Sequence, residues 1–173
     1  KMKEVTYSYS ISNEDDEAEK TFLSLNYVTG KSTDDEVYTD LNILEYILLE
    51  AEGAPLKKAL IDAEIGKDVF GSFDNGIQQP VFSIIVKNSD VDKTEEFKNL
   101  VYSTLRDVVK NGIDKKLIEG CINTVEFKLR ESDTGSYPKG LVYYTNAMDS
   151  WLYGGDPLQH IRYEDALKSV KKA

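Results

Sequence analysis

The N-terminal part of the chain alternates apolar and polar residues with the period of two that is typical of half-buried strands. In a first stretch, Tyr7, Tyr9 and Ile11 share one face and serines share the other. A second strand-like stretch runs from Phe22 to Val28. The acidic segment NEDDEAEK (13–20) between them lacks the spaced ligands and the turn glycine of a known calcium loop. We therefore predict two strands joined by a solvated turn.

The spacing then becomes helical, with one apolar stripe from about Val37 to Ala51 that contains Leu41, Leu44, Ile47 and Leu48. Gly53 is expected to end this helix. Pro55 opens the next helix, at a first-turn position where a missing N–H costs nothing. We expect Gly66 to close that second helix.

Two further strands are predicted by the segments VFGSFDNG (69–76) and PVFSIIVKNS (80–89). In the second segment apolar residues occupy both alternating faces, as in a central strand covered by helices. The first segment is shorter and contains Gly71, which favours the edge of a sheet.

Helical patterns dominate the rest of the chain, over about 92–112, 114–132 and 140–154, and again near the C-terminus. Cys121 falls inside an apolar stripe, which indicates a buried, inert thiol. Strands in closely linked pairs favour an antiparallel sheet, and grouped helices favour a separate layer. We predict an α+β fold: a two-layer sandwich of an antiparallel β-sheet packed against helices, as a single domain over 1–173.

Net charge and composition restrict the classes of binding partner and the cellular compartment that we expect. The 173 residues contain 21 Lys and Arg against 31 Asp and Glu, for a formal net charge of -10, which disfavours nucleic acid. No apolar run is long enough to predict a membrane span. A single cysteine suits a reducing compartment, and we expect bacterial cytoplasm rather than an organelle matrix. The way the chain starts and ends suggests a piece of a longer protein.

The segment NILEY has the spacing of a zinc helix, with two side chains four residues apart and a glutamate between them. Here the two positions hold Asn42 and Tyr46, an amide and a neutral phenol, which bind zinc poorly. Glu45 alone makes no metal site. We predict neither a metal site nor catalytic residues in this chain.

The sequence gives little support for other catalytic or ligand-binding sites. His160 is the single histidine and no G-x-S-x-G motif occurs, so a serine triad is not expected. GSYPKG (135–140) lacks the spacing of a phosphate-binding loop and is interpreted as a connection between helices. Trp151, with Tyr143, Tyr144 and Tyr153, lies at helical spacing, which favours a core or interface over a ligand site.

Several segments together resemble one family. NYVTGKSTDDEVYTDLNILEYILLEAEGAPLKKAL, QPVFSIIVKN, INTVEFKLRESDTGSYPKGL and WLYGGDPL occur in this order and span nearly the whole chain. They are similar to the second, non-catalytic domain of insulinase-like (pitrilysin) zinc metallopeptidases, in the presequence-protease branch. The combination of FKLRE, TGSYPKGL and WLYGGDP is the most specific part of this resemblance.

The resemblance implies a role for this domain. Family members carry four related α+β domains in two halves that close around a chamber. The first domain holds zinc on an H-x-x-E-H motif, and the last lends an arginine and a tyrosine. The parent protein is therefore expected to be a zinc endopeptidase for unfolded peptides. Its second domain would hold no cofactor and would contact the other domains of the same polypeptide and the peptide substrates.

In relatives the second domain also binds the substrate's N-terminal end, where the peptide adds a strand to an exposed sheet edge. By position this exosite would comprise Val69, Phe70 and Gly71 beside the turn at Glu52 and Gly53, with Glu52 near the substrate's α-ammonium. Ordinary surface turn residues are the competing interpretation of Glu52 and Gly53.

Two alternatives stay open. The domain could be a structural or assembly part of an inactive homologue of the same family. An independent small enzyme is the other alternative, and it would require these 173 residues to cleave peptides.

Overall fold

The computed structural model describes residues 2–12, 16–131 and 134–171. Within these residues one antiparallel sheet is formed, in the order β1-β3-β2. Its strands are β1 (Thr21–Val28), β2 (Asp68–Asp74) and β3 (Val81–Ser89). β3 pairs with both neighbours, so the predictions of a central strand and of an edge strand near Gly71 are confirmed.

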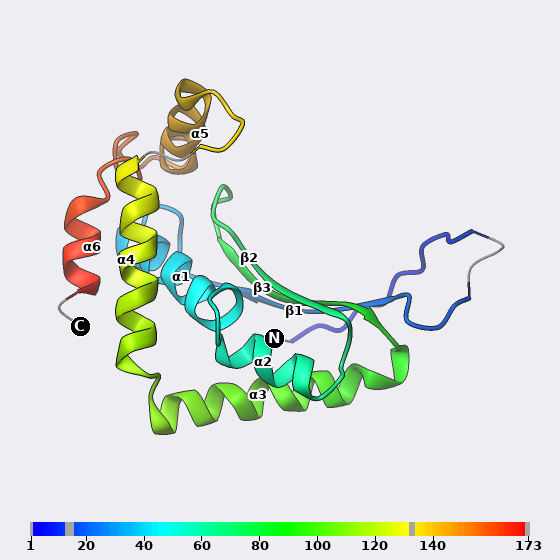
Figure 1. Ribbon diagram of the computed structural model, residues 1–173. Coiled ribbons are helices and arrows are strands. Elements are labelled where there is room, and N and C mark those ends of the chain that lie inside the picture. Colours follow the sequence, from blue (N-terminus) through cyan, green and yellow to red (C-terminus); the bar gives the residue numbers. More distant parts are fainter. Residues whose placement is uncertain (1, 13–15, 132–133, 172–173) are drawn as a thin grey trace.

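Helices surround one side and one end of this sheet (Figure 1). They are α1 (Asp35–Glu45), a π-helical turn (Tyr46–Glu50), α2 (Pro55–Asp62), a 3-10 turn (Val91–Lys93), α3 (Thr94–Asn111), α4 (Lys115–Glu131), α5 (Lys139–Trp151) and α6 (Glu164–Val170). In the described part of the chain, no helix is both long and apolar enough to cross a membrane. The α+β sandwich predicted from the alternation of patterns is confirmed.

The main core lies between the sheet and the helices beneath it. Alternate strand residues such as Val69, Ile84 and Val86 point into this layer and are almost fully buried. They meet Leu48 and Leu49 of the π-helical turn, Leu56 and Leu60 of α2, and Phe97 and Val101 of α3. This contiguous apolar burial is the main stabilising contribution to the two-layer arrangement.

A second core joins α1 to the C-terminal helices. Ile43, Ile47 and Ala51 pack against Cys121 and Ile122 of α4 and against Leu167 of α6. Burial raises the pKa of the Cys121 thiol above its ordinary value. The prediction of a buried, inert cysteine agrees with this position.

The predicted single stripe on the first helix is wrong at Leu44. This side chain is 37% exposed, whereas Ile43 is 3% exposed. The helix serves two cores: Leu41 and Leu48 contact the sheet-side core, while Ile43 and Ile47 contact the second core. On the helix, Leu44 lies between these two apolar faces. The helix also begins earlier than predicted, because Asp34 caps it and accepts a hydrogen bond from the Val37 amide.

The predicted strand at Tyr7, Tyr9 and Ile11 is also wrong, since residues 2–12 form no strand. The Tyr9 ring packs edge-on against Phe22 of β1, with 5.8 Å between centroids, and its hydroxyl donates to the Lys20 carbonyl. An alternating pattern predicts an apolar face but supplies no pairing partner. A side-chain contact therefore replaces a ladder of backbone hydrogen bonds.

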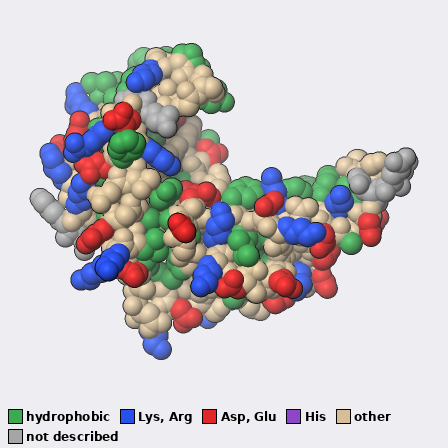
Figure 2. Space-filling model, viewed as in Figure 1, with side chains coloured by type: hydrophobic (Ala, Val, Ile, Leu, Met, Phe, Trp, Pro, Cys, Tyr) green, Lys and Arg blue, Asp and Glu red, His purple; other side chains and the backbone are tan. Residues whose placement is uncertain are grey.

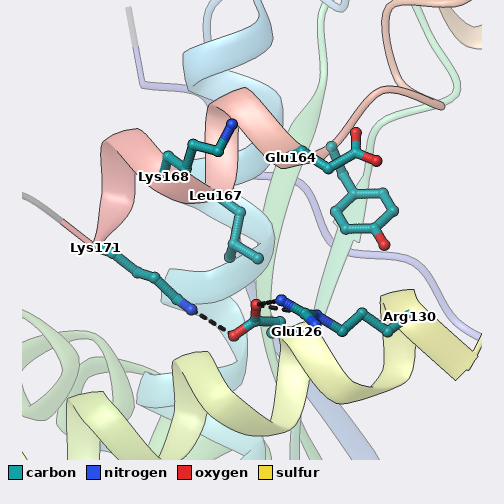
Figure 3. Close-up of a pocket in the computed structure, with 7 residues that line it drawn as sticks. Glu126, Arg130, Glu164, Leu167, Lys168 and Lys171 are labelled. Carbon is teal, nitrogen blue, oxygen red and sulfur yellow. Dashed lines mark hydrogen bonds and ion pairs between the residues drawn. The ribbon is translucent and has the colours of Figure 1, made fainter.

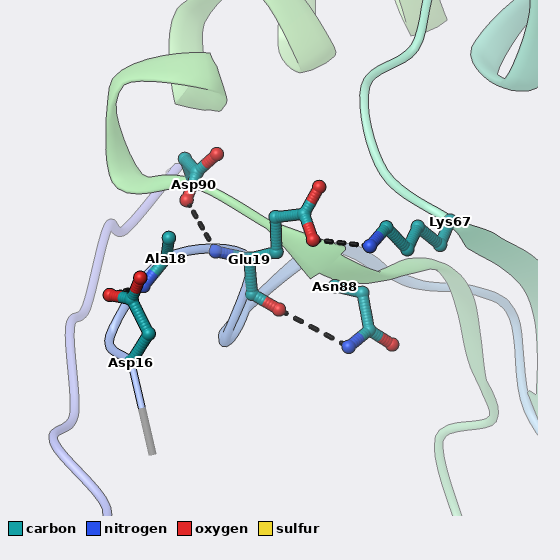
Figure 4. Close-up of polar contacts among 6 residues, drawn as sticks. All are labelled: Asp16, Ala18, Glu19, Lys67, Asn88 and Asp90. Atoms are coloured by element: carbon teal, nitrogen blue, oxygen red, sulfur yellow. Dashed lines mark hydrogen bonds and ion pairs between the residues drawn. The ribbon is translucent and has the colours of Figure 1, made fainter.

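The predicted turn at 13–20 is described only from Asp16 onward, and residues 13–15 lie outside the described part of the chain. Its second half is fixed to the sheet through Glu19 (Figure 4). The Glu19 amide donates to Asp90 at 2.7 Å, its carbonyl accepts from Asn88 at 3.1 Å, and its carboxylate pairs with Lys67. These contacts hold the start of β1 against the ends of the other two strands.

One face of the sheet carries no helix among the described residues, contrary to the expectation that helices cover both faces of the central strand (Figure 1). Phe70, Ile85 and Ser24 stand in one cross-strand row on this face, followed by Ser72, Ser83 and Asn26. We call this surface the open sheet face. It is concave, and α5 stands at one end of it (Figures 1 and 2).

Candidate functional site

The helix that carries NILEY places its three candidate side chains in different environments. The Asn42 amide donates to the Tyr38 carbonyl at 2.7 Å, one turn earlier in the helix. The Tyr46 ring lies under the ammonium of Lys128, with 5.0 Å from the nitrogen to the ring centroid. Among the residues that the structure describes, no group of three or more His, Cys, Asp or Glu side chains is placed to hold a metal ion.

Glu45 instead lies against the edge strand. A Cβ atom added to Gly71 would approach the Glu45 side chain, with 3.0 Å to its Cδ and less to its Oε1. Burial raises the pKa of the Glu45 carboxyl, and the nearby Glu50 carboxylate raises it further, while Lys128 and Lys57 oppose the shift. The absence of a side chain at Gly71 therefore allows a half-buried carboxylate to reach the backbone of β2.

The π-helical turn brings a second carboxylate to the same place. The Ala51 amide donates to the Tyr46 carbonyl at 2.8 Å, five residues back, so residues five apart come near one side of the chain. Glu50 thereby joins Glu45 beside β2, and its Oε1 accepts from the Gly71 amide at a long 3.5 Å. Sequence reasoning missed Glu50, because in a regular α-helix a residue five positions from Glu45 would point elsewhere.

The Gly71 contact also shows which way the edge strand presents its backbone. β2 pairs with β3 on one side. The Gly71 amide points away from β3, toward Glu50. Alternate residues of an antiparallel strand direct their backbone groups to the same side, so Val69 and Phe73 direct theirs the same way, although Val69 is buried at 3% exposure. Among the described residues no further strand pairs with this side of β2, and such an edge is a suitable template for an added strand.

The other predicted exosite residues are spread around this edge. Glu52 and Gly53 are exposed in the turn after the π-helical segment, and Gly53 has a φ of +80° that favours glycine. Val69 is buried, with the whole residue only 3% exposed. Phe70 is half-buried on the open sheet face, with the Lys87 ammonium 4.9 Å from its ring centroid. The two carboxylates that lie against β2 are Glu45 and Glu50.

The open sheet face adjoins this edge and mixes apolar and polar side chains. Lys87 lies over both Phe70 and Phe22, at 4.9 and 5.7 Å from their centroids. Figure 2 shows the hollow between this face and the region around α5. Small hydroxyl and amide groups lie beside aromatic rings on this face.

A separate depression of about 460 Å³ lies between α4 and α6 (Figure 3). At its base Glu126 accepts from Arg130 at 2.6 Å and pairs with Lys171. These two cations lower the pKa of the Glu126 carboxyl, with the Lys171 hydrogen bond as the larger cause. Because the two cations already pair with Glu126, we interpret this cluster as a clasp that fastens α6 to α4.

The comparisons with known proteins agree with this picture. Residues 3–125 match the family model described as the Peptidase M16 inactive domain. The chain belongs to this family. The earlier resemblance to the non-catalytic domain of presequence-protease relatives is thereby confirmed.

Two curated relatives are considerably longer than this chain. The chain is 53% identical to Protein HypA of Clostridium perfringens over 172 residues, which are 99% of this chain and 18% of HypA. It is 29% identical to Presequence protease 1, chloroplastic/mitochondrial, of Arabidopsis thaliana, over 94% of this chain and 15% of that protein. The chain therefore spans less than a fifth of either relative.

A solved structure shows the same fold. It is the inactive peptidase domain of a protein assigned as a zinc protease from Bordetella parapertussis, with a TM-score of 0.68 and 12% identity. The match covers 85% of this chain and 75% of that domain. At this identity the likeness supports the fold, while family membership rests on the match over residues 3–125.

Proposed function

We propose that this M16 inactive domain is a non-catalytic part of a zinc-dependent endopeptidase that degrades unfolded peptides inside a chamber. The zinc ion would be held by the H-x-x-E-H motif of another domain of the same polypeptide. The open sheet face would form part of the chamber wall. Its concave shape and its mixed aromatic and hydroxyl side chains support this role.

The observation that carries the proposal is that β2 is an edge strand at Gly71, with no further strand of the described residues beside it. An extended substrate would pair with the outward backbone groups of Gly71 and Phe73, as peptides do in β-strand addition. The contact between the Gly71 amide and Glu50 is 3.5 Å long, so it is weak and a substrate carbonyl can replace it. Backbone pairing accepts many sequences, which suits a peptidase for unfolded peptides.

The carboxylates beside this edge would bind the substrate's N-terminal α-ammonium. Glu50 lies directly against the Gly71 amide, and Glu52 is exposed two residues further along. The net charge of -10 would add long-range attraction for basic peptides. The exosite predicted from the sequence is thus extended from Glu52 to include Glu50.

The exosite is tested in the full-length protein with Glu50→Gln, Glu52→Gln and the control Glu119→Gln, which changes an exposed glutamate on α4. Losing an exposed ion pair costs up to about 1 kcal/mol, so Glu50→Gln should raise KM for a long peptide with a free N-terminus up to about fivefold. KM for the same peptide with an acetylated N-terminus, and for a short peptide, should be unchanged. If neither exosite variant changes any KM, the exosite is removed from the proposal.

The catalytic part of the proposal has its own test. The protein around this domain is expected to carry an intact H-x-x-E-H motif, and the isolated 173 residues should cleave no peptide with or without added zinc. A flanking domain without the two histidines would instead favour a structural or assembly role in an inactive homologue.

A further inference from the structure

In helix α5 (Lys139–Trp151) the two buried residues are polar, whereas several large apolar side chains are exposed. Its buried residues are Asp149, at 7% exposure, and Ser150, at 0%. Leu141, Tyr144 and Trp151 are 52%, 61% and 59% exposed. This is the reverse of the distribution expected for a helix on the surface of a soluble domain.

The inner side of α5 and of the following loop is fixed by hydrogen bonds. The Ser150 hydroxyl donates to the Asp156 carbonyl at 2.7 Å. In the following loop, Gln159 donates to the Thr33 carbonyl at 2.8 Å. His160 stacks on Tyr38 of α1 at 3.6 Å between centroids. Rotation that would bury the apolar side of α5 against this chain would break these contacts, so the apolar side faces outward.

The outward side chains form a continuous stripe. Leu141, Tyr144, Met148 and Trp151 follow one another at spacings of three, four and three residues, which is one side of an α-helix. Tyr137 before the helix and Leu152 after it are also exposed, at 66% and 62%. Figure 2 shows hydrophobic side chains over this part of the molecule. We call this surface the α5 stripe.

The charge distribution points to a protein contact. Asp149 is the one charged residue between Gly140 and Gly155, in a chain whose residues are 30% charged. Protein interfaces are depleted of charged residues at their centre and enriched in Tyr, Trp and Met. The α5 stripe has this composition, and its partner must offer an uncharged, apolar surface.

The size of the stripe favours a covalently linked partner over a second copy of the chain. Thirteen residues give a helix about 20 Å long and about 10 Å wide, or roughly 200 Å² of footprint. A stable dimer buries about 800 Å² on each partner, so this stripe alone cannot hold two free copies together. A linked domain needs less area, because the linker raises its effective concentration to about the millimolar range.

We propose that the α5 stripe is the surface on which another domain of the same polypeptide packs. The inference rests on the premise of the proposed function that this chain is one domain of a longer protein, and the relatives are more than five times its length. It assigns to α5 a role in assembling the protein, separate from the peptide edge at Gly71.

The test measures alkylation of introduced cysteines in the full-length protein, peptide by peptide, by mass spectrometry. Tyr144→Cys reports on the α5 stripe, and Val109→Cys is the matched control on α3, where Val109 is 86% exposed. Tyr144→Cys is expected to react at least about tenfold more slowly than Val109→Cys, because a domain contact with a free energy of about 1.4 kcal/mol already gives that factor. Equal rates would overturn the proposal.

Dilution of the protein distinguishes a linked domain from a second copy of the chain as the partner that covers the α5 stripe. If a linked domain covers the stripe, the alkylation rate of Tyr144→Cys should stay the same when the protein is diluted about a hundredfold. Protection that disappears on dilution would mean a second copy and would overturn the assignment. The unmodified protein gives a check that needs no variant: hydroxyl-radical oxidation of Tyr144 and Trp151 should be as low as that of buried Phe97, after correction for residue type. High oxidation of both would also refute the proposal.

These measurements need neither substrate nor peptide cleavage. If the α5 stripe is protected but Glu50→Gln leaves KM unchanged, the proposed exosite is refuted and the proposed domain contact is retained. If the α5 stripe is unprotected but Glu50→Gln raises KM, the domain contact is refuted and the exosite is retained.

Discussion

Replacing Gly71 with alanine tests how tightly the edge strand packs on the π-helical turn. The added Cβ would lie 2.7 Å from Leu49 Cδ1 and 3.0 Å from Glu45 Cδ, both too close for ordinary contact. The φ of Gly71 is not in the left-handed region, so the effect is steric. Leu49 is completely buried and has little room to retreat.

The cost follows from these contacts. Overpacking of a well-filled core typically destabilises by about 1–3 kcal/mol. The lower backbone entropy of alanine in the unfolded chain returns about 0.5–1 kcal/mol. Taking the two effects together, we expect Gly71→Ala to lower the free energy of unfolding by about 0–2.5 kcal/mol, with a central value of about 1 kcal/mol.

The assay is equilibrium urea unfolding followed by circular dichroism. Gly120→Ala is the matched control, because Gly120 lies inside α4 with no heavy atom within 4 Å of the added Cβ. Alanine is the better helix former, so this control should raise stability by about 0.5–1 kcal/mol.

Glu45→Ala separates the two close contacts. It removes the Glu45 contact and leaves that with Leu49, so part of the loss caused by Gly71→Ala should be recovered in the double variant. A coupling energy of at least about 0.5 kcal/mol is expected for residues in contact. If Gly71→Ala raises stability as much as Gly120→Ala does, the tight packing of β2 against this turn is refuted.

Two further predictions concern the helices around the site. Asp34→Ala removes the cap of α1, whose side chain accepts from the Val37 amide at 3.3 Å, and should lower the free energy of unfolding by about 1 kcal/mol in the same assay. Glu126 has a lowered pKa, so its contribution to stability is present above its ordinary value of 4.5 and is lost as the pH falls through the lowered value. Glu126→Gln should therefore reduce stability at pH 7 and weaken its decline in acid; an unchanged pH profile of urea midpoints would contradict the clasp.

The secondary structure was predictable where local pattern and tertiary burial agree. The β3 segment has apolar residues on both alternating faces, and this strand is indeed central. Pro55 does open α2, and Gly112 does end α3 with a φ of +75°. Proline fixes φ at a value that suits the first turn of a helix, and glycine adopts the positive φ of a helix end without a steric penalty.

The candidate site was less predictable, because it depends on how elements pack. The exposure of Leu44 follows from a helix that contacts two cores, and a single stripe cannot reveal a second partner. The position of Glu50 beside Gly71 follows from the π-helical turn, which has no reliable signal in residue type. The outward stripe of α5 is visible in the sequence as a set of aromatics, but only the buried Asp149 and Ser150 show which side of the helix faces the chain.

The π-helical turn also constrains how this region can change in evolution. A π-turn holds one residue more than the corresponding α-helical turn, so it has the form of a single-residue insertion into the helix that begins at α1. Deleting one residue between Tyr46 and Glu50 would restore regular α-helical winding there with little rotation of α1 relative to α2, because the π-turn already holds the extra residue within one turn. A one-residue deletion is therefore expected to be tolerated better in this turn than within α1, where it would rotate the preceding residues by about 100° relative to both cores.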